Sequence, residues 1–412
     1  MKNLLFLTNM FPSETAAYYR DQGFVAGGNN ITYIQEALLD GFDACEGIDC
    51  TVINKMLIRR GGKARIPARA WNHCADGEPR DFSFSYVNKP FFSSNLLFHY
   101  AKPHIAAWLG KTNGDRMVIA YGLTNYTLSA MAYIKKHAPE ATTAIIVPDL
   151  PEHTKRKTKN PIIRLKNGIT NYLTARKIRT CAPKVDRFFL FAEAMKEPLG
   201  CADRFTVFEG LATDTFADIE ASRWEHGERA IVYGGGLHAK YGLDLLMDAF
   251  SLLEGEEYRL VLCGNGDYVP EIRRRAESDP RIMYMGTVPR EELLSYQAGA
   301  SVLVNPRTGK EEFSKYSFPS KNMEYLSSGV PMVGFKLGGI PDEYNSYIAY
   351  PEAETPVALA AKLEAICGAE REAAIARAIS AKDFVLSQKN KCVQARKILD
   401  AMTMCDVAGE GI

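Results

Sequence analysis

A group of polar residues at the start of one predicted helix has the types and spacing needed to bind a phosphorylated ligand. It lies in EFSKYSFPSKNMEYLSSGVP, residues 312–331, just after the apolar strand pattern SVLVNP. Pro319 suits the first turn of a helix, where its missing N–H leaves no hydrogen bond unmade. Free amides at a helix start form a positive dipole end that favours phosphate. The donors expected here belong to Ser317, Phe318, Ser320 and Lys321.

A carboxylate lies one helical turn beyond these donors. Glu324 follows Lys321 by three residues, so both side chains share one face of the helix. A carboxylate only accepts hydrogen bonds, which suits the two donor hydroxyls of a ribose. Arg307, at the end of SVLVNP, is placed to neutralise phosphate together with Lys321. The spacing therefore predicts a nucleotide diphosphate site, although such Ser-x-Pro openings with a Lys–Glu pair also occur on ordinary surface helices.

Glycines mark the ends of several neighbouring strand patterns. RAIVYGGG ends in three glycines, YRLVLCGNGD contains GNGD, and RIMYMGTV ends in MGTV. Glycine lets a backbone approach a ligand closely, and the glycines do not form the GxGxxG pattern of dehydrogenases. Several such strand ends favour a binding role over simple turns. The candidate residues are Gly235, Gly236 and Gly264, with the backbone groups of Thr287 and Val288 as readers of a base edge.

Strand and helix patterns alternate in both halves of the chain, and the alternation restarts at RAIVYGGG. Repeated strand–helix–strand units predict parallel sheets with helices on both faces. We therefore expect an α/β protein with two Rossmann-like, doubly wound domains that face a central cleft, where ligands bind beyond the carboxyl ends of the strands. The expected domains are 1–212 and 229–385, joined by a polar linker at 213–228, and a C-terminal helix at 386–412 is a candidate for crossing back to the first domain.

Composition indicates a soluble globular protein. The chain has 412 residues, 46% of them hydrophobic, and its 50 basic and 49 acidic side chains nearly cancel. No apolar run approaches the roughly 18 residues of a membrane-spanning helix, and we expect no signal peptide. Nine cysteines without a CxxC pair favour reduced thiols in the cytoplasm. Cys45 and Cys50 lack further partners at zinc-like spacing, so no metal is expected.

One segment departs from this charge balance. Residues 155–187 contain 11 Lys or Arg residues and the single acid Asp186, with apolar residues such as Ile169 and Tyr172 between them. This pattern favours contact with anionic lipid at a membrane surface, and a solvated helix that covers the core is the alternative. No nucleic-acid-binding motif accompanies the charge, so nucleic acid is not an expected partner.

The order of the motifs resembles that of a known family. Strand–GGG–helix, GNGD, MGTV, NPR, YSFPSKxxEYLSSGVP and GGIPDE look like the C-terminal domain of retaining glycosyltransferases of family four, which have the GT-B fold. The bacterial enzymes that build capsular polysaccharide, exopolysaccharide or O-antigen are the most similar in appearance. The resemblance is specific over residues 229–345 and weaker over 1–212. It implies a nucleotide-sugar donor, usually a UDP-sugar, and metal-independent transfer with retention of configuration.

The resemblance also implies roles for single residues and shows two departures. Glu324 corresponds to the glutamate that bonds the ribose hydroxyls. The family's other glutamate, eight residues earlier, touches the transferred sugar, and Tyr316 stands in its place here. A basic pair that often follows the first strand of this domain is replaced by Gly236 and Tyr241, with Lys240 one residue off register. Arg307 and Lys321 are therefore the candidates for stabilising the leaving diphosphate.

In the first domain, the resemblance implies that the segment with Gly27 and Gly28 approaches the donor phosphates and the acceptor. The strand pattern AIIVPD presents Asp149, and His153 follows shortly after. Either side chain is a candidate for orienting or deprotonating the acceptor hydroxyl, with a purely structural turn as the alternative. In retaining transfer the leaving phosphate can itself take this proton, so a dedicated base is not required.

These observations predict a cytoplasmic hexosyltransferase that uses a saccharide or lipid-linked saccharide acceptor, with a peripheral position at the inner membrane face as a further hypothesis. Two alternatives stay open. A nucleotide-sugar 2-epimerase would act on the donor without an acceptor. A nucleotide-sugar-binding protein without catalysis is suggested by Tyr316 at the position of the usual glutamate.

Overall fold

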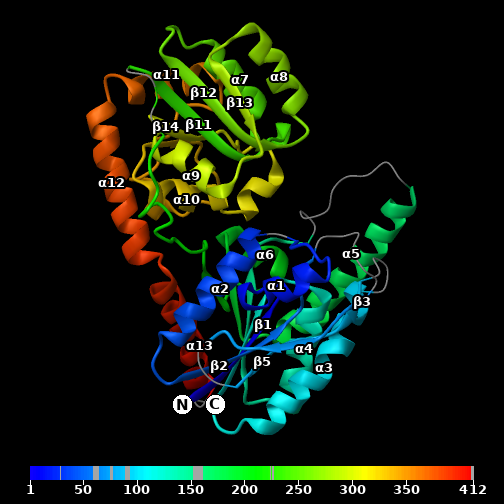
Figure 1. Cartoon of the computed structure of the whole chain (residues 1–412). Coiled ribbons are helices and arrows are strands. Elements are labelled where there is room, and N and C mark those ends of the chain that lie inside the picture. Colours follow the sequence, from blue (N-terminus) through cyan, green and yellow to red (C-terminus); the bar gives the residue numbers. More distant parts are fainter. Residues whose placement is uncertain are drawn as a thin grey trace. The chain divides into compact units, whose positions relative to one another are not determined.

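The chain folds into two α/β units. The computed structural model describes residues 1–27, 29–58, 65–74, 78–88, 93–151, 161–222, 224 and 227–409. One unit comprises Met1–Glu209 with Lys391–Ile412, and the other comprises Gly210–Asn390. Each unit has its own parallel sheet with helices packed against it (Figure 1).

The first unit is built on an eight-stranded sheet and a separate strand pair. Its strands are β1 (Lys2–Thr8), β2 (Ile48–Asn54), β3 (Arg65–Ile66), β4 (Arg69–Trp71), β5 (Asp81–Ser83), β6 (Tyr86–Val87), β7 (Arg116–Tyr121), β8 (Thr142–Val147), β9 (Arg187–Leu190) and β10 (Phe205–Val207). Its helices are α1 (Ser13–Asp21), α2 (Asn29–Asp43), α3 (Ser93–Lys111), α4 (Asn125–His137), α5 (Pro161–Cys181), α6 (Lys196–Leu199) and α13 (Lys391–Gly409).

The sheet of the first unit has the order β10-β9-β8-β7-β1-β2-β5-β4, and β3 pairs only with β6. Neighbouring strands are parallel except β4 and β5. Central β1 carries the apolar run from Leu4 to Leu7, which is almost completely buried. Such a continuous run is typical of a parallel strand covered on both faces.

The C-terminal helix α13 is part of the first unit. It packs against α2, where Lys391 Nζ lies 2.7 Å from Asp40 Oδ2. Further along, the Lys2 ammonium donates to Thr403 Oγ1 at 2.9 Å, so the helix also contacts the start of the chain. Helix α13 thus packs onto the first unit, which also contains the start of the chain.

The second unit is built on a five-stranded sheet. Its strands are β11 (Arg229–Gly236), β12 (Tyr258–Asn265), β13 (Ile282–Gly286), β14 (Val302–Asn305) and β15 (Met332–Gly334). Its helices are α7 (Leu243–Ser251), α8 (Val269–Ser278), α9 (Arg290–Ala298), α10 (Ser320–Ser328), α11 (Pro356–Cys367) and α12 (Arg371–Gln388). The short 3₁₀ turns used below are η3 (Ala239–Tyr241) and η4 (Glu312–Tyr316).

The strand order of the second sheet reverses beside its first strand. The order is β13-β12-β11-β14-β15 and all pairs are parallel. The chain runs from β11 outward to β13 and then returns to the other side of β11 with β14. Open α/β sheets bind ligands at such a reversal, beyond the carboxyl ends of the two strands. In this unit a ligand is therefore expected beside the loops after β11 and β14.

The described residues of the predicted linker, 213–228, lie within the second unit. The backbone N–H of Ser222 donates to Ser295 O at 3.0 Å, and Trp224 Nε1 donates to Gly299 O at 2.9 Å. These bonds hold the segment against α9. The chain passes between the units at Glu209–Gly210 and again at Asn390–Lys391.

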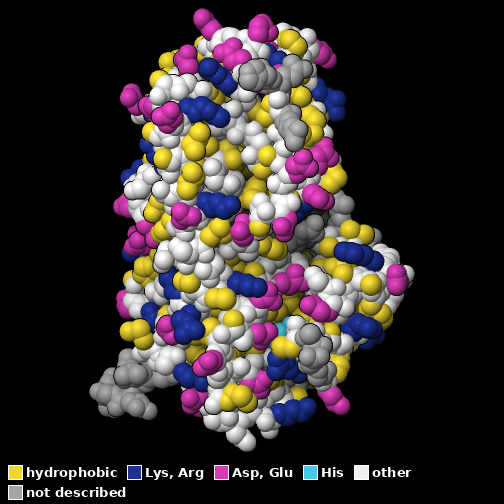
Figure 2. Space-filling view, turned by 60° about the vertical axis from the view of Figure 1, so that its left-hand side comes forward, with side chains coloured by type: hydrophobic (Ala, Val, Ile, Leu, Met, Phe, Trp, Pro, Cys, Tyr) yellow, Lys and Arg dark blue, Asp and Glu magenta, His cyan; other side chains and the backbone are white. Residues whose placement is uncertain are grey.

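The visible surface has no separation of charge by sign. Lys and Arg side chains alternate with Asp and Glu side chains over the face shown in Figure 2, as expected from the nearly balanced composition. Among the described residues, no helix combines the length and apolar character that crossing a bilayer requires.

The close pairing of β11 and β12 depends on a glycine at their carboxyl ends. Gly264 pairs with Gly235 and has φ +134°, a backbone conformation that side chains rarely adopt. A Cβ atom on Gly264 would lie 1.8 Å from the carbonyl oxygen of Gly235. The two strand ends can therefore approach only when residue 264 has no side chain.

We predict that Gly264→Ala lowers the free energy of unfolding by about 2–4 kcal/mol, because the methyl group overlaps main chain and the residue is strained. Gly286→Ala is the matched control. Gly286 also has a positive φ of +72°, but no heavy atom lies within 4 Å of its Cβ position, so we expect only about 1–2 kcal/mol. Urea unfolding of both variants measures the difference, and equal losses would contradict the close approach.

Candidate functional site

A lysine side chain occupies the space left by a glycine at the end of β11. Lys321, from the first turn of α10, extends to Gly235, where a Cβ atom would lie 2.3 Å from Lys321 Cε. Its ammonium donates to Tyr233 Oη at 3.2 Å and lies 4.8 Å from the centroid of the Tyr233 ring. The Lys321 side chain is half-buried, with the Tyr233 and Tyr241 rings near its ammonium.

Two further cations reach the same corner. Three cations lie near the centroid of the Tyr241 ring: Lys240 Nζ at 5.0 Å, Arg307 Cζ at 5.8 Å and Lys321 Nζ at 5.7 Å. Arg307 and Lys240 also lie 4.2 and 5.5 Å from the Phe313 ring. We call Lys240, Arg307 and Lys321, with Tyr241 and Phe313, the cationic corner. Cation–π contacts compensate part of the repulsion between the three charges.

The electrostatics of the corner favour an anion. The pKa of Lys321 is lowered to about 8, mainly by burial and to a smaller extent by the charge of Arg307, while Tyr241 and Glu324 oppose the shift. A depressed lysine pKa means that the folded protein holds this ammonium at a free-energy cost. An anion bound beside it would remove that cost. Perturbed pKa values of this kind are typical of functional sites.

Helix α10 begins directly at the corner. Ser320 is its first residue and Pro319 precedes it as the N-cap, so the prediction that Pro319 lies in the first turn is wrong by one position. The reason is local: the Pro319 carbonyl already accepts the N–H of Asn322 at 2.8 Å. No side chain caps this helix start. Its first amides therefore remain suited to an anion.

The position of α10 is fixed from the neighbouring strand. Asn305 Nδ2, at the end of β14, donates to Asn322 Oδ1 at 2.6 Å, and both side chains are buried. Arg307 follows two residues later, is buried, and lies with Nη1 3.5 Å from Ser317 Oγ. One strand end thus positions the guanidinium and the start of the helix together.

Glu324 lies one turn beyond Lys321 and is held by α9. Gln297 Nε2 donates to Glu324 Oε1 at 3.0 Å, and Arg290 Nη1 lies 3.3 Å from Glu324 Oε2. Gln297 is buried, whereas more than half of the Arg290 side chain is exposed. The carboxylate is therefore oriented by a fixed amide on one oxygen and by an exposed guanidinium on the other.

The other predicted residues of the second unit surround this corner or follow neighbouring strands. Gly236 ends β11, where a Cβ atom would lie 3.3 Å from the Tyr241 ring. Thr287 is exposed in the turn after β13, and Val288 packs against the core. Tyr316 ends η4 with the Lys315 ammonium 4.8 Å from its ring centroid, and Phe318 is buried against Tyr344.

The other predicted site residues belong to the first unit. Asp149 is exposed in the turn after β8. Burial raises the pKa of Tyr121 well above its usual range, and the charge of Asp149 adds to that effect. Gly27 N–H donates to Leu57 O at 2.9 Å, so this glycine is part of a backbone contact. Gly28 and His153 lie outside the described residues.

Several residues of the corner escaped the sequence predictions. Tyr233 and Phe313 were not among the predicted site residues, and Tyr241 was noted only as the replacement of a basic residue. A signal existed at Lys240, the basic residue next to Tyr241, because its ammonium reaches the site where the family pattern expects a cation. Arg290 carried no signal, since its contact with Glu324 depends on how α9 packs beside α10.

Comparison with known proteins identifies a domain in the second unit. Residues 228–368 match the family described as glycosyl transferases group 1. Sulfoquinovosyl transferase SQD2 from Arabidopsis thaliana is 27% identical over 124 residues, which are 30% of this chain. The match spans only 22% of the length of that curated relative. Residues 228–368 therefore form a group 1 glycosyl transferase domain.

Solved structures are similar over nearly the whole chain. Sucrose-phosphate synthase from Thermosynechococcus elongatus has a TM-score of 0.67 and 13% identity, covering 99% of this chain and 100% of that one. Alr3699/HepE from Anabaena, in complex with UDP, has a TM-score of 0.61 and 13% identity, covering 98% and 100%. Such low identity shows the fold alone. The expected GT-B fold, with two Rossmann-like parallel sheets, is confirmed.

We predict that Lys321→Met abolishes the thermal stabilisation that inorganic pyrophosphate gives to the protein, without lowering the free energy of unfolding at neutral pH. Removing a desolvated cation leaves that free energy unchanged or raises it by on the order of 1 kcal/mol. Differential scanning calorimetry with and without pyrophosphate measures both quantities.

Lys382→Met is the control, since Lys382 is another half-buried lysine of the same unit and pairs with Asp214. It should keep the response to pyrophosphate. A collapse of the melting temperature in Lys321→Met, with the pyrophosphate response retained, would assign Lys321 a structural role.

Proposed function

We propose that this chain, whose residues 228–368 form a group 1 glycosyl transferase domain, is a retaining glycosyltransferase. It transfers a sugar from a nucleotide-diphosphate donor, a UDP-sugar, to a saccharide or lipid-linked saccharide acceptor in the synthesis of a cell-surface polysaccharide. The cationic corner carries this proposal. Three cations meet one aromatic ring beside the start of α10, at the reversal of strand order.

In this proposal the diphosphate of the donor binds in the cationic corner. The bond between the anomeric carbon and the diphosphate oxygen breaks, and negative charge grows on that oxygen. Lys321, Arg307 and the first amides of α10 stabilise this charge, which is the main work of the protein in such a transfer. The acceptor oxygen forms the new bond on the same face of the sugar, and its proton passes to the leaving phosphate.

The nucleoside binds one helical turn away. Glu324 accepts hydrogen bonds from the two ribose hydroxyls, and Gln297 holds its carboxylate in place for this contact. The exposed Arg290 leaves Glu324 Oε2 when the ribose arrives, since both compete for the same oxygen. The backbone groups of Thr287 and Val288, after β13, contact the base. HepE, a protein of the same fold, has been solved with UDP bound.

The acceptor is assigned to the first unit. Gly27 and Gly28 approach the acceptor and the donor phosphates, and Asp149 or His153 orients the acceptor hydroxyl. Asp149 is exposed after β8, as a residue that meets substrate needs to be. No metal takes part in the transfer, because the cations of the corner perform the neutralisation that a metal would otherwise supply.

Contact with a membrane surface is proposed for residues 155–187. Within the described part of α5, the exposed fractions of Ile169 and Tyr172 are 46% and 66%, and Arg176 and Arg179 are exposed on the same helix. Apolar and basic residues together suit an anionic interface. Co-sedimentation with anionic rather than neutral vesicles supports this placement at the inner face of a cytoplasmic membrane, and equal binding to both opposes it.

Transfer itself is tested with a panel of UDP-, GDP-, dTDP- and ADP-sugars. Thermal shift selects the donor, because a ligand that binds only the folded state raises the melting temperature. The selected radiolabelled donor is then incubated with a polyprenyl-diphosphate-linked monosaccharide. A labelled lipid product and free nucleotide support the transferase. An isomerised donor without acceptor would identify an epimerase, and binding without any product would identify a non-catalytic protein.

We predict that Glu324→Gln weakens binding of UDP at least about tenfold, because an amide cannot accept from both ribose hydroxyls as a carboxylate does. The wild-type protein should bind UDP more tightly than 2′-deoxy-UDP, and Glu324→Gln should lose this preference. Isothermal titration calorimetry measures both ligands, with Glu292→Gln on α9 as control. A variant that still prefers the ribonucleotide would show that the ribose binds elsewhere.

We predict that affinity for UDP falls about tenfold between about pH 7 and pH 9, because Lys321 loses its proton as the pH rises through about 8. Stability should move the other way. The folded-state pKa lies below the ordinary lysine pKa of 10.5, so the cost of holding the charged lysine disappears as the pH rises from about 8 towards 10.5.

Lys321→Arg is the control for this pH profile, since an arginine stays charged over the whole range. Its affinity for UDP should be flat with pH, whatever its absolute value. The same slope in wild type and variant would mean that another group governs binding.

A further inference from the structure

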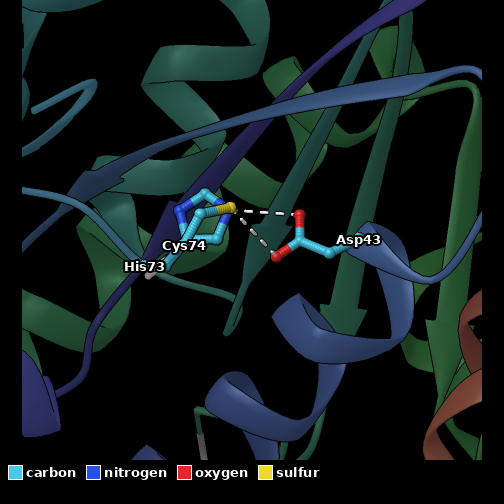
Figure 3. A group of neighbouring side chains, drawn as sticks. All are labelled: Asp43, His73 and Cys74. Atoms are coloured by element: carbon cyan, nitrogen blue, oxygen red, sulfur yellow. Dashed lines mark hydrogen bonds and ion pairs between the residues drawn. The ribbon is translucent and has the colours of Figure 1, made fainter. Parts of the chain in front are cut away.

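A second cluster of chemically competent side chains lies in the first unit. Asp43 is the last residue of α2, and His73 and Cys74 follow β4. One ligand atom from each residue lies within 4.8 Å of the other two. Figure 3 shows the Asp43 carboxylate directed toward the His73 ring and the Cys74 sulfur. The cluster belongs to the first unit, whereas the cationic corner belongs to the second, and the two share no residue.

The spacing within the cluster matches that of ligands around one metal ion. His73 Nε2 lies 3.2 Å from Asp43 Oδ1, and Cys74 Sγ lies 3.6 Å from Asp43 Oδ2. A tetrahedral zinc ion with its usual bond lengths places nitrogen and oxygen ligands about 3.3 Å apart, and sulfur and oxygen ligands about 3.5 Å apart. The two contacts use different oxygens of Asp43, so the carboxylate must turn to share one oxygen with the ion, while the three ligand atoms already lie within 4.8 Å of one another.

The histidine is oriented as metal-bound histidines are. His73 Nδ1 lies 2.6 Å from Asp81 Oδ2, and the backbone N–H of His73 donates to the same oxygen at 2.7 Å. The other oxygen of Asp81 accepts from the Val52 N–H on β2. Asp81 is fully buried and fixed by the sheet. A carboxylate that holds Nδ1 leaves Nε2 as the ligand atom, which is the usual outer-shell arrangement of zinc sites.

The surrounding charges suit a divalent cation. Arg80 lies 2.8 Å from Cys74 Sγ through Nη2 and 2.8 Å from Asp49 Oδ1 through Nη1. Metal binds the thiolate form of a cysteine, and this sulfur has a guanidinium beside it. With metal bound, the region holds four negative charges, from Asp43, Asp49, Asp81 and a Cys74 thiolate. A divalent ion and Arg80 supply three positive charges, so the two signs balance to within one charge.

We propose that Asp43, His73 and Cys74 bind a zinc ion, with water in the fourth position. Mixed sulfur, nitrogen and carboxylate oxygen ligands are the set that zinc accepts. The ion joins the end of α2 to the segment between β4 and β5, at the edge of the first sheet, so its role is structural. This site departs from the expectation of a protein without metal, which considered only Cys45 and Cys50.

Binding must displace protons. Without metal, both ring nitrogens of His73 face carboxylates; burial alone would lower the pKa of this histidine, but hydrogen bonds to Asp43 and Asp81 raise it to about 10. When zinc binds, the Nε2 proton and the Cys74 thiol proton leave to solvent, and the Nδ1 proton stays on the bond to Asp81. No electron is transferred.

The test uses the full-length protein after removal of metal by a chelator. Zinc is added in competition with a chromophoric chelator, and one equivalent should bind at this site. Cobalt(II) is the second probe, because a thiolate bound to cobalt gives a near-ultraviolet charge-transfer band and a tetrahedral site gives intense visible bands. Zinc should also raise the melting temperature of the protein.

Cys74→Ser should lower zinc affinity at least about a hundredfold and remove the charge-transfer band, and Asp43→Asn should weaken zinc without removing that band. The matched control is Cys392→Ser, which removes an exposed thiol and should change nothing. If Asp43→Asn fails to fold, the cobalt spectrum of Cys74→Ser still shows whether Cys74 binds the metal. Two results would overturn the proposal: the wild-type protein takes up no zinc in competition with the chelator, or it binds zinc no more tightly than Cys74→Ser does. The three residues would then form only a hydrogen-bond network.

Discussion

Three like charges held against one aromatic ring are the constraint on which the second unit depends. Lys240, Arg307 and Lys321 repel one another, and burial of Lys321 adds to the cost. The fold maintains them because each comes from a different element: η3, the loop after β14 and the start of α10, the last two tied together by the Asn305–Asn322 bond. Such an arrangement is typical of a site that binds an anion, and it is the basis of the proposed diphosphate site.

Several features of the second unit bring the residues of the cationic corner together. Gly235 leaves room for the lysine stem, and Gly264 lets β12 approach β11 at the same level. The Asn305–Asn322 bond ties the helix start to the strand that delivers Arg307. The reversal of strand order between β11 and β14 opens the carboxyl edge of the sheet at this point. Glycines, amides and cations thus lie together at one corner of the second unit.

Much of this could be predicted from local sequence, because strand and helix periodicity fix the order of elements in a doubly wound sheet. Arg307, Lys321 and Glu324 belong to one short stretch, so their common location followed from strand-end and helix spacing. The rest depends on tertiary packing. Phe313 stacks on Arg307 through a loop whose path no spacing determines, Arg290 meets Glu324 from another helix, and Asp43 meets His73 across 30 residues. The burial of Lys321 could not be foreseen, since its neighbours Tyr233 and Tyr241 come from a distant strand and turn.

A crystal structure of the protein with UDP tests the assignment of the cationic corner most directly. The β-phosphate oxygens should lie about 2.7–3.2 Å from Lys321 Nζ, from a nitrogen of Arg307 and from the first amides of α10, with the ribose hydroxyls on Glu324. An ordered UDP molecule bound elsewhere, with these three cations in their unliganded positions, would contradict it.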